Sequence, residues 1–332
     1  MLDIDRWLNG YRARLTAGDV SAQHFWRIEH FADDLRPFTD RTMDEDLVED
    51  YANHLMTLSP WNRWHHGKLF RQFTMYMYER RAADLPRNIK RMAFKRPKPN
   101  PEALSVEQAK QVLAIASPRQ RLYSLLALNC GYGSRDISLL PQGCVQDGRM
   151  TRTRHKTGVE SSHVLWGPTR TILARYAQPA GPALLLTTHG QPLVQVDYQN
   201  GKFRHLDSVR LAWNRLRVKA NVTVGFYGLR KTGATLLAGQ GESDIVISAY
   251  LSHADSSMRK HYVDRQAVQR KLDEAVMKLG NLLEIDRLSP GSTLGPAKLH
   301  ETRLELVTFG SVDRCSIQLS YSCVRQTNYS ME

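Results

Sequence analysis

Apolar residues recur every three or four positions through much of the chain, which is the spacing of helices with one buried face. In the first 85 residues this pattern predicts a bundle of about four helices, with Ser21 and Thr42 as helix-start signals. The positions that carry the pattern most clearly are Ile4, Trp7, Leu8 and Tyr11, then Leu47, Tyr51, Leu55 and Met56, then Phe70, Phe73, Met75 and Met77.

After residue 102, sequence signals predict further helices. Ser105 and Gln108 form a capping box ahead of a helix over residues 106–116. Gly131 suits the C-terminal cap of the next helix. The other expected helices cover residues 120–129, 207 or 208 to 219, and 266–283, the last with one apolar face. Ser134 is the expected N-cap of a further short helix, and Pro168 begins another.

Two turn signals, Asp147-Gly148 and Thr157-Gly158, separate three strand-like runs between the predicted helices. Runs joined by such short turns pair in antiparallel fashion. The predicted fold class is therefore mainly α with a small antiparallel β-sheet. The tail over residues 285–332 does not continue the pattern, and no role is assigned to it.

Residues 86–102 differ in composition from the segments on either side. Four prolines keep the second half of this stretch from forming a helix, and no acidic residue occurs before Glu102. Its cations are Arg87, Lys90, Arg91, Lys95, Arg96 and Lys98. We expect an interdomain linker whose cations neutralise phosphates of DNA, the alternative being a solvated linker without a partner.

Length and composition indicate how many domains the chain has and which kind of partner it binds. A chain of 332 residues suits two domains, and a net charge of +13 favours a polyanionic partner such as nucleic acid over a merely basic surface. The four cysteines show neither zinc-site nor disulfide spacing, so neither a zinc site nor a disulfide framework is expected. The sequence also gives no indication of a cofactor. Without a signal segment or membrane span, the expected location is cytoplasmic, in association with the nucleoid.

One helix of the first bundle combines aromatic and cationic residues. Trp61 and Trp64 are interleaved with Arg63, Lys68 and Arg71. Such side chains suit contacts with a DNA backbone. Core packing of the two tryptophans is the alternative.

Three groups suited to phosphate chemistry lie at fixed intervals between residues 225 and 263. Arg230 is followed by His253 after 23 residues and by Tyr262 after nine more. Arginine matches two phosphate oxygens, histidine exchanges a proton near neutrality, and a tyrosine hydroxyl can attack phosphorus. Singly, these residues suit an ion pair, a core histidine and a packing aromatic. Together they predict a phosphoryl-transfer site that needs no metal.

The order and spacing of these three residues, with the strings YGLRKTGAT and LSHADSSMRKHY, resemble the C-terminal signature of the tyrosine recombinases, or phage integrases. Tyr227 stands where that family commonly has a histidine, and Ser252 replaces the glycine before His253. The resemblance implies a helical core-binding (SAM-like) domain over residues 1–85 and an α/β catalytic domain over residues 103–284. Together they would clamp duplex DNA.

The resemblance also implies roles for the candidate residues. Tyr262 would attack a scissile phosphate to give a 3′-phosphotyrosyl link, and Arg230 would neutralise the developing charge. His253 and Tyr227 would position the phosphate or assist proton transfer. Lys156 would protonate the leaving oxygen, because the family carries its catalytic lysine on this β-hairpin just before a Thr-Gly turn.

The strand that leads to Lys156 carries three more cations and no acid. Arg149, Arg152 and Arg154 are candidates for DNA contacts, and strand alternation puts Arg152, Arg154 and Lys156 on one face. A row of phosphate-contacting cations without a catalytic member is the alternative.

The family's first arginine has no plain counterpart in the segment GYGSRDISLL. The family pattern is Gly-x-Arg-x-x-Glu/Asp. Matching Asp136 to the acid puts Gly133 at the arginine position, whereas matching Arg135 to the arginine puts Ser138 at the acid position. The acid-matched register fits the hydrophobic spacing better. Arg135 stays a candidate to reach the phosphate from the first turn of the short helix.

The implied function is site-specific recombination or integration of a mobile element, with double-stranded DNA as substrate. The implied assembly is a homotetramer on paired sites, with an accessory DNA-bending protein as a further partner. Two alternatives stay open: a DNA-binding relative with impaired catalysis, and DNA relaxation of the type IB topoisomerase kind.

Overall fold

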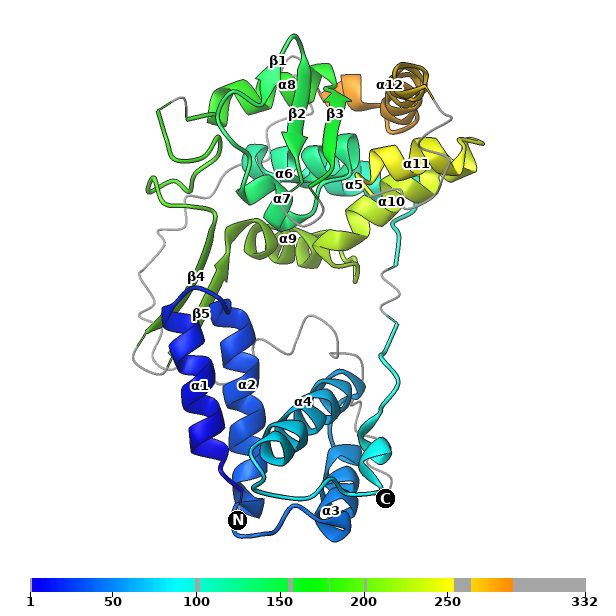
Figure 1. Cartoon of the computed structure of the whole chain (residues 1–332). Helices are drawn as coiled ribbons and strands as arrows, with labels where there is room; N and C mark the ends of the chain where they lie inside the picture. Colours follow the sequence, from blue (N-terminus) through cyan, green and yellow to red (C-terminus); the bar gives the residue numbers. More distant parts are fainter. Residues whose placement is uncertain are drawn as a thin grey trace, which may run out of the picture. The chain divides into compact units, whose positions relative to one another are not determined.

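The computed structural model describes residues 2–98, 102–154, 158–178, 180–199, 202–253 and 264–288 (Figure 1). They form two compact units. The first unit runs to Asn100 and includes Val194–Asp207, and the second comprises Pro101–Leu193 and the chain from Ser208 onward. The first unit thus extends past the expected boundary at residue 85 and takes in a segment from the middle of the expected catalytic domain.

The first unit contains the four α-helices that the apolar pattern predicts. Ser21 accepts a hydrogen bond from the backbone N–H of His24 and begins the second helix, as expected. Thr42 does not cap the third helix, because Asp44 accepts the bond from the N–H of Leu47. The helices are α1 (Ile4–Thr16), α2 (Ala22–Leu35), α3 (Glu45–Met56) and α4 (Pro60–Glu79), with a short 3₁₀ turn, η1 (Arg36–Phe38), after α2.

The core of this bundle is aromatic. Phe31, Tyr51, Phe70 and Phe73 are fully buried, and the rings of Tyr51 and Phe70 stack with centroids 4.9 Å apart. Most of the positions predicted to be buried lie in this core. Met56, the last residue of α3, is exposed, and so is Met75, which lies on a different face of α4 from the buried Phe73 and Met77.

The first half of the expected linker packs onto the first unit. It forms a 3₁₀ turn, η2 (Ile89–Met92), in which Met92 is fully buried. Gly67 on α4 permits this approach, since a Cβ there would lie 2.5 Å from the Phe94 ring and 2.6 Å from the Met92 carbonyl oxygen. The apolar residues among the cations therefore anchor part of a segment that composition alone presents as a free linker.

A β-hairpin that the sequence analysis did not identify completes the first unit. Strands β4 (Val194–Gln199) and β5 (Lys202–Asp207) pair in antiparallel register and pack on α2. Tyr198 meets Phe25 edge to face with centroids 5.0 Å apart, and its hydroxyl donates to the Glu29 carboxylate. Phe203 stacks on Trp26 at 5.2 Å.

The second unit is built around α6 (Pro118–Cys130), in which every residue from Leu122 to Cys130 is buried. It packs against α8, α9 and α10 (Figure 1). The other helices are α5 (Val106–Ile115), α7 (Ser134–Ser138), α8 (Gly167–Tyr176), α9 (Ser208–Lys219), α10 (Phe226–Gly239), α11 (Asp244–Tyr250), α12 (Arg265–Leu282) and the 3₁₀ turn η4 (Ile285–Leu288). The capping box at Ser105 and the left-handed Gly131 after α6 are both confirmed.

The predicted three-stranded sheet is also confirmed. Its antiparallel order is β1 (Val145–Gln146), β2 (Arg149–Thr153) and β3 (Glu160–Val164). Asp147 and Gly148 both have positive φ, 49° and 74°, as a tight two-residue hairpin turn requires. In the second pair Arg152 lies opposite Ser161, which fixes where the side chains of β2 point.

A half-buried carboxylate joins three helices of the first unit. The Asp34 carboxylate accepts hydrogen bonds from the Tyr51 hydroxyl at 2.8 Å, and it lies 2.9 Å from both His54 Nε2 and His66 Nδ1. These hydrogen bonds outweigh the effect of burial and hold the pKa of Asp34 well below its usual range. The carboxylate therefore stays ionised while it ties α2 to α3 and α4.

We expect Asp34→Ala to lower the free energy of unfolding by about 2–4 kcal/mol, because it leaves the buried Tyr51 hydroxyl and the His66 imidazole without their acceptor. Urea denaturation measures this loss. The neighbouring Asp33→Ala is the matched control: Asp33 is exposed and 3.4 Å from Arg36, so its loss should change stability little. Equal losses in the two variants would contradict the role given to Asp34.

Candidate active site

Arg230 is held at the centre of the second unit by groups from three elements. It lies on α10 and is 1% exposed. Its guanidinium donates to the carbonyl oxygens of Gly131, at the end of α6, and Leu251, at the end of α11. Its Nη1 also lies 3.9 Å from Asp136 Oδ2 on α7. The planar fork therefore has one fixed orientation.

Two glycines make this arrangement possible. Gly131 has a φ of +63°, and a Cβ there would lie 2.7 Å from the Tyr250 carbonyl oxygen. At Gly233 a Cβ would lie 1.9 Å from the hydroxyl oxygen of Tyr250, which donates to the Leu128 carbonyl oxygen at 2.7 Å. Close packing of α11 against α6 and α10 thus places Leu251 where Arg230 can reach it.

Asp136 is the only carboxylate paired with three arginines among the described residues. Its Oδ1 lies 2.6 Å from Arg152 Nη2 and 3.8 Å from Arg154 Nε, and its Oδ2 lies near Arg230. Oδ2 also accepts a hydrogen bond from the Gly133 N–H at 2.9 Å. One negative charge thus faces three positive charges, which leaves two positive charges unbalanced.

The three guanidiniums also have spare donors. Their Nε atoms are buried and have no hydrogen-bond partner among the described residues. The side chains of Arg152, Arg154 and Arg230 are only 3%, 14% and 2% exposed. Buried cations are costly unless they are paired and hydrogen-bonded, so this cluster is suited to binding an anion.

His253 and Tyr227 lie close to the cluster. Burial, followed by the charges of Arg230 and Arg154, lowers the pKa of His253 below its usual value. The imidazole is therefore neutral at neutral pH and free to accept a proton. Tyr227 lies in the first turn of α10, one turn before Arg230, and is 51% exposed.

The structure thus brings together Arg152, Arg154, Arg230 and His253. Arg135 is exposed on α7 and makes no ion pair with any residue that the structure describes, whereas Asp136 lies beside Arg230, which favours the acid-matched register. Lys156 and Tyr262 lie outside the described residues. The hairpin expected to carry Lys156 is present, since the Arg154 N–H donates to the Val159 carbonyl oxygen at 2.8 Å.

The other expected DNA-contacting cations differ in how free they are. Arg149 is occupied within the second unit, because its Nη1 and Nη2 bind the Asp273 carboxylate of α12 at 2.7 and 3.0 Å. Arg91 pairs with Glu49 at 3.1 Å, and Arg96 lies over the half-buried rings of Trp61 and Trp64. All six cations of this segment are exposed, and the other four are Arg87, Lys90, Lys95 and Lys98.

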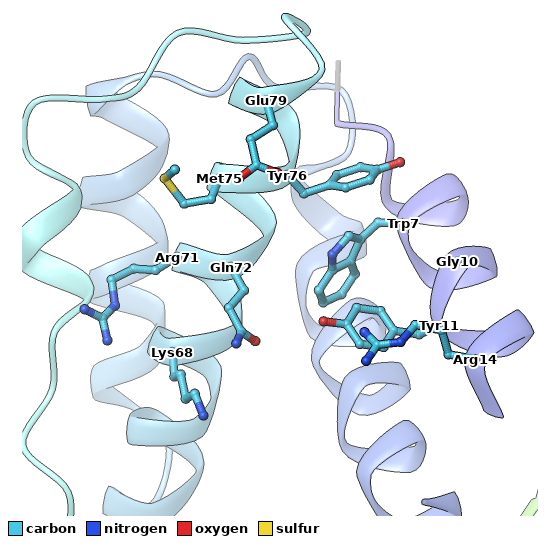
Figure 2. A pocket seen from close by; sticks show the side chains of 10 residues that line it. All are labelled: Trp7, Gly10, Tyr11, Arg14, Lys68, Arg71, Gln72, Met75, Tyr76 and Glu79. Atoms are coloured by element: carbon cyan, nitrogen blue, oxygen red, sulfur yellow. The ribbon is translucent and has the colours of Figure 1, made fainter. Parts of the chain in front are cut away.

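A second cationic surface lies on the first unit. A groove of about 620 Å³ between α1 and α4 is lined by Trp7, Gly10, Tyr11, Arg14, Lys68, Arg71, Gln72, Met75, Tyr76 and Glu79. Figure 2 shows Trp7 and Tyr11 of α1 facing Gln72 and Tyr76 of α4. Arg63 is not part of this surface, because its guanidinium donates to carbonyls at the end of α3 and just beyond.

Sequence reasoning did not identify the ring side chains that pack next to the arginine cluster. The Arg152 guanidinium lies over the Tyr132 ring at 4.4 Å. His163 on β3 is fully buried, with its ring 5.6 Å from that of Tyr132 and 6.2 Å from that of Tyr250. Burial, with a smaller effect of the Arg152 charge, lowers the pKa of His163 to about 3. His163 is therefore a neutral packing group.

Ser252 stands where the tyrosine recombinases usually have glycine. Its backbone is in the left-handed region. Ser252 has a φ of +46° and is 1% exposed. Glycine adopts this conformation without strain, whereas other residues pay roughly 1–2 kcal/mol. The serine keeps the backbone turn that places His253 after α11.

The described part of the chain contains neither a membrane-spanning helix nor a metal-binding cluster. None of its helices combines the length and the apolar character needed to cross a bilayer. It also holds no cluster of three or more His, Cys, Asp or Glu side chains arranged for a metal ion.

We expect His163→Phe to reduce the acid sensitivity of folding. Because the folded-state pKa of about 3 lies below the unfolded value of 6.5, the unfolded chain binds an extra proton as the pH falls through this window. His163 therefore removes up to about 1.4 kcal/mol of stability per pH unit below 6.5, and the variant should lose this contribution. Chemical denaturation across that range measures it. The exposed His189→Gln is the control, and an unchanged slope in His163→Phe would contradict the assignment.

Comparisons with known proteins agree with this geometry at the level of fold. No family model matches the chain, and no curated protein matches it. The structure of lambda integrase residues 75–356 bound to DNA superposes with a TM-score of 0.55 at 16% identity, covering 77% of this chain and 93% of that one. A dimer of the same fragment on a COC′ core site gives a TM-score of 0.53 at 18% identity, covering 78% and 95%. The chain has the fold of lambda integrase, the mainly α fold that the resemblance to the tyrosine recombinases implies.

Proposed function

We propose that the protein is a site-specific DNA recombinase or integrase that cleaves and rejoins DNA through a 3′-phosphotyrosyl intermediate. The observation that carries this proposal is the cluster of three arginines around Asp136, two buried and one half-buried, with two positive charges unbalanced and spare donors. A scissile phosphodiester supplies the missing negative charge. The fold supports the proposal, since the matching lambda integrase structures are described as bound to DNA.

The reaction would proceed by exchange of one phosphate ester for another. The Tyr262 hydroxyl attacks phosphorus, a bond forms between its oxygen and phosphorus, and the bond to the 5′ oxygen breaks. Lys156 gives a proton to the departing oxygen, and the neutral His253 assists removal of the tyrosine proton. Arg230 stabilises the charge on the non-bridging oxygens. The 5′-hydroxyl of a partner strand then attacks the phosphotyrosine and restores Tyr262.

Both units would contact the same duplex. The exposed cations of the first unit, Arg87, Lys90, Lys95 and Lys98, and those of the groove, Arg14, Lys68 and Arg71, suit phosphate contacts independent of base sequence. Strand exchange needs two cleaved duplexes, so the proposed assembly is a homotetramer on paired sites. An accessory DNA-bending protein belongs to the same proposal.

One observation favours a second candidate, a DNA-binding relative with impaired catalysis. Position 133, where the acid-matched register expects an arginine, is glycine. Losing one donor from a preorganised anion site costs about 10²–10³ in rate. Such a protein would bind duplex DNA and form no covalent intermediate.

We expect the wild-type protein to form an SDS-resistant adduct with DNA that flanks its own gene, carried on a nicked duplex that traps cleavage. Tyr262→Phe should abolish the adduct and leave duplex affinity within about threefold, because only the nucleophile is lost. Tyr78→Phe is the matched control and should keep the adduct, since Tyr78 is an exposed tyrosine of α4 in the first unit. Tight binding without any wild-type adduct would instead establish the binding-protein alternative.

A further inference from the structure

The three arginines around Asp136 differ in how completely the fold fixes them. Arg230 donates to two backbone carbonyls. Arg152 has the shortest ion pair, 2.6 Å, and lies over the Tyr132 ring. Arg154 is held least, because its Nε is 3.8 Å from Asp136 Oδ1 and its side chain is the most exposed of the three, at 14%. Arg154 is therefore the guanidinium best able to turn toward a ligand.

Arg154 also lies within electrostatic reach of the two residues that the proposed reaction uses. Burial, followed by the charge of Arg154, lowers the pKa of Arg230. The charge of Arg154 contributes in the same direction to the lowered pKa of His253, after burial and Arg230. Like charges this close repel in an empty site, and a bound phosphate anion relieves that repulsion.

The backbone at Gly133 would accept a side chain next to Asp136. Gly133 has φ −84° and ψ 171°, an extended conformation open to any residue. A Cβ built there lies 3.4 Å from Asp136 Oδ2, an ordinary van der Waals contact. A side chain at position 133 would thus begin beside the carboxylate that Arg154 reaches from the residue after β2. Glycine leaves that place without a guanidinium.

We propose that Arg154 is a catalytic residue of this protein, supplying from just after β2 the second phosphate-binding guanidinium that position 133 lacks. This inference rests on the proposed function, because it assigns a contact to the same scissile phosphate. Arg152 is instead a positioning residue, which holds Asp136 and the base of the hairpin in place.

The first test is Arg154→Ala, measured as the rate of adduct formation on the nicked duplex. Loss of one guanidinium should slow the adduct about 100-fold or more, with duplex affinity reduced less than about tenfold. The melting temperature should stay the same or rise, because Asp136 keeps Arg152 and Arg230 while the repulsion between cations falls. Arg154→Lys, which keeps the charge without the planar fork, should give an intermediate rate.

The second test moves the guanidinium to the other side of the carboxylate. The double variant Gly133→Arg, Arg154→Ala should regain at least tenfold of the lost rate, since the backbone at position 133 accepts a side chain. Arg135→Ala tests the other candidate for this contact, the exposed arginine of the same short helix, and should leave the rate within about threefold of wild type. Arg175→Ala is the control, because Arg175 is an exposed arginine of α8 outside the cluster.

The outcomes distinguish a failure of the proposed function from a failure of the inference about Arg154. A wild-type protein that binds DNA without forming an adduct overturns the proposed function and this inference with it. A wild-type adduct with an unchanged rate in Arg154→Ala overturns the inference alone. So does a folded double variant that regains no activity, or a loss of rate confined to Arg135→Ala.

Discussion

The ion pairs of Asp136 are the interaction on which the candidate site depends. This carboxylate caps its own short helix through the Gly133 N–H and draws guanidiniums from β2 and α10 toward one point. Close packing of α11 against α6 and α10 over Gly131 and Gly233 places the carbonyl oxygens that hold Arg230 there. The glycines, the Tyr250 hydroxyl and the Arg230 fork thus serve a single arrangement, in which several cations surround one acid.

That arrangement is incomplete without a ligand. A buried cation normally has a matching acid or a full set of acceptors, and here three arginines share one carboxylate. Holding these cations together costs free energy, and the binding of an anion offsets that cost. A preorganised electrostatic site favours a charged transition state in this way. The same imbalance explains why removing one cation should not harm folding while it harms the reaction.

Much of the fold follows from sequence signals because those signals are local. The capping box at Ser105, the left-handed Gly131 and the Asp147-Gly148 turn each act within a few residues, and the structure confirms all three. The hairpin over residues 194–207 also carries a local signal, Asn200-Gly201 between alternating residues. Its place on α2 was not predictable, since Tyr198 meets Phe25 and Glu29, which are remote in sequence.

In the candidate site, too, local features are visible in the sequence, whereas contacts between remote residues are not. The spacing of Arg230 and His253 is visible in the sequence, and strand alternation puts Arg152 and Arg154 on one face. Neither feature reveals that this face meets Asp136, because that contact joins β2 to a different helix. Likewise, the cationic composition of residues 86–98 conceals Met92, whose burial is decided by Gly67 on α4.

The most direct test of the arginine cluster is a crystal structure of the Tyr262→Phe variant on a duplex that contains its exchange site. The account predicts one phosphate whose non-bridging oxygens accept hydrogen bonds from Arg230 and Arg154, with Arg152 still paired to Asp136. A bound duplex whose phosphates all lie away from these arginines, with the cluster unchanged around Asp136, would contradict it.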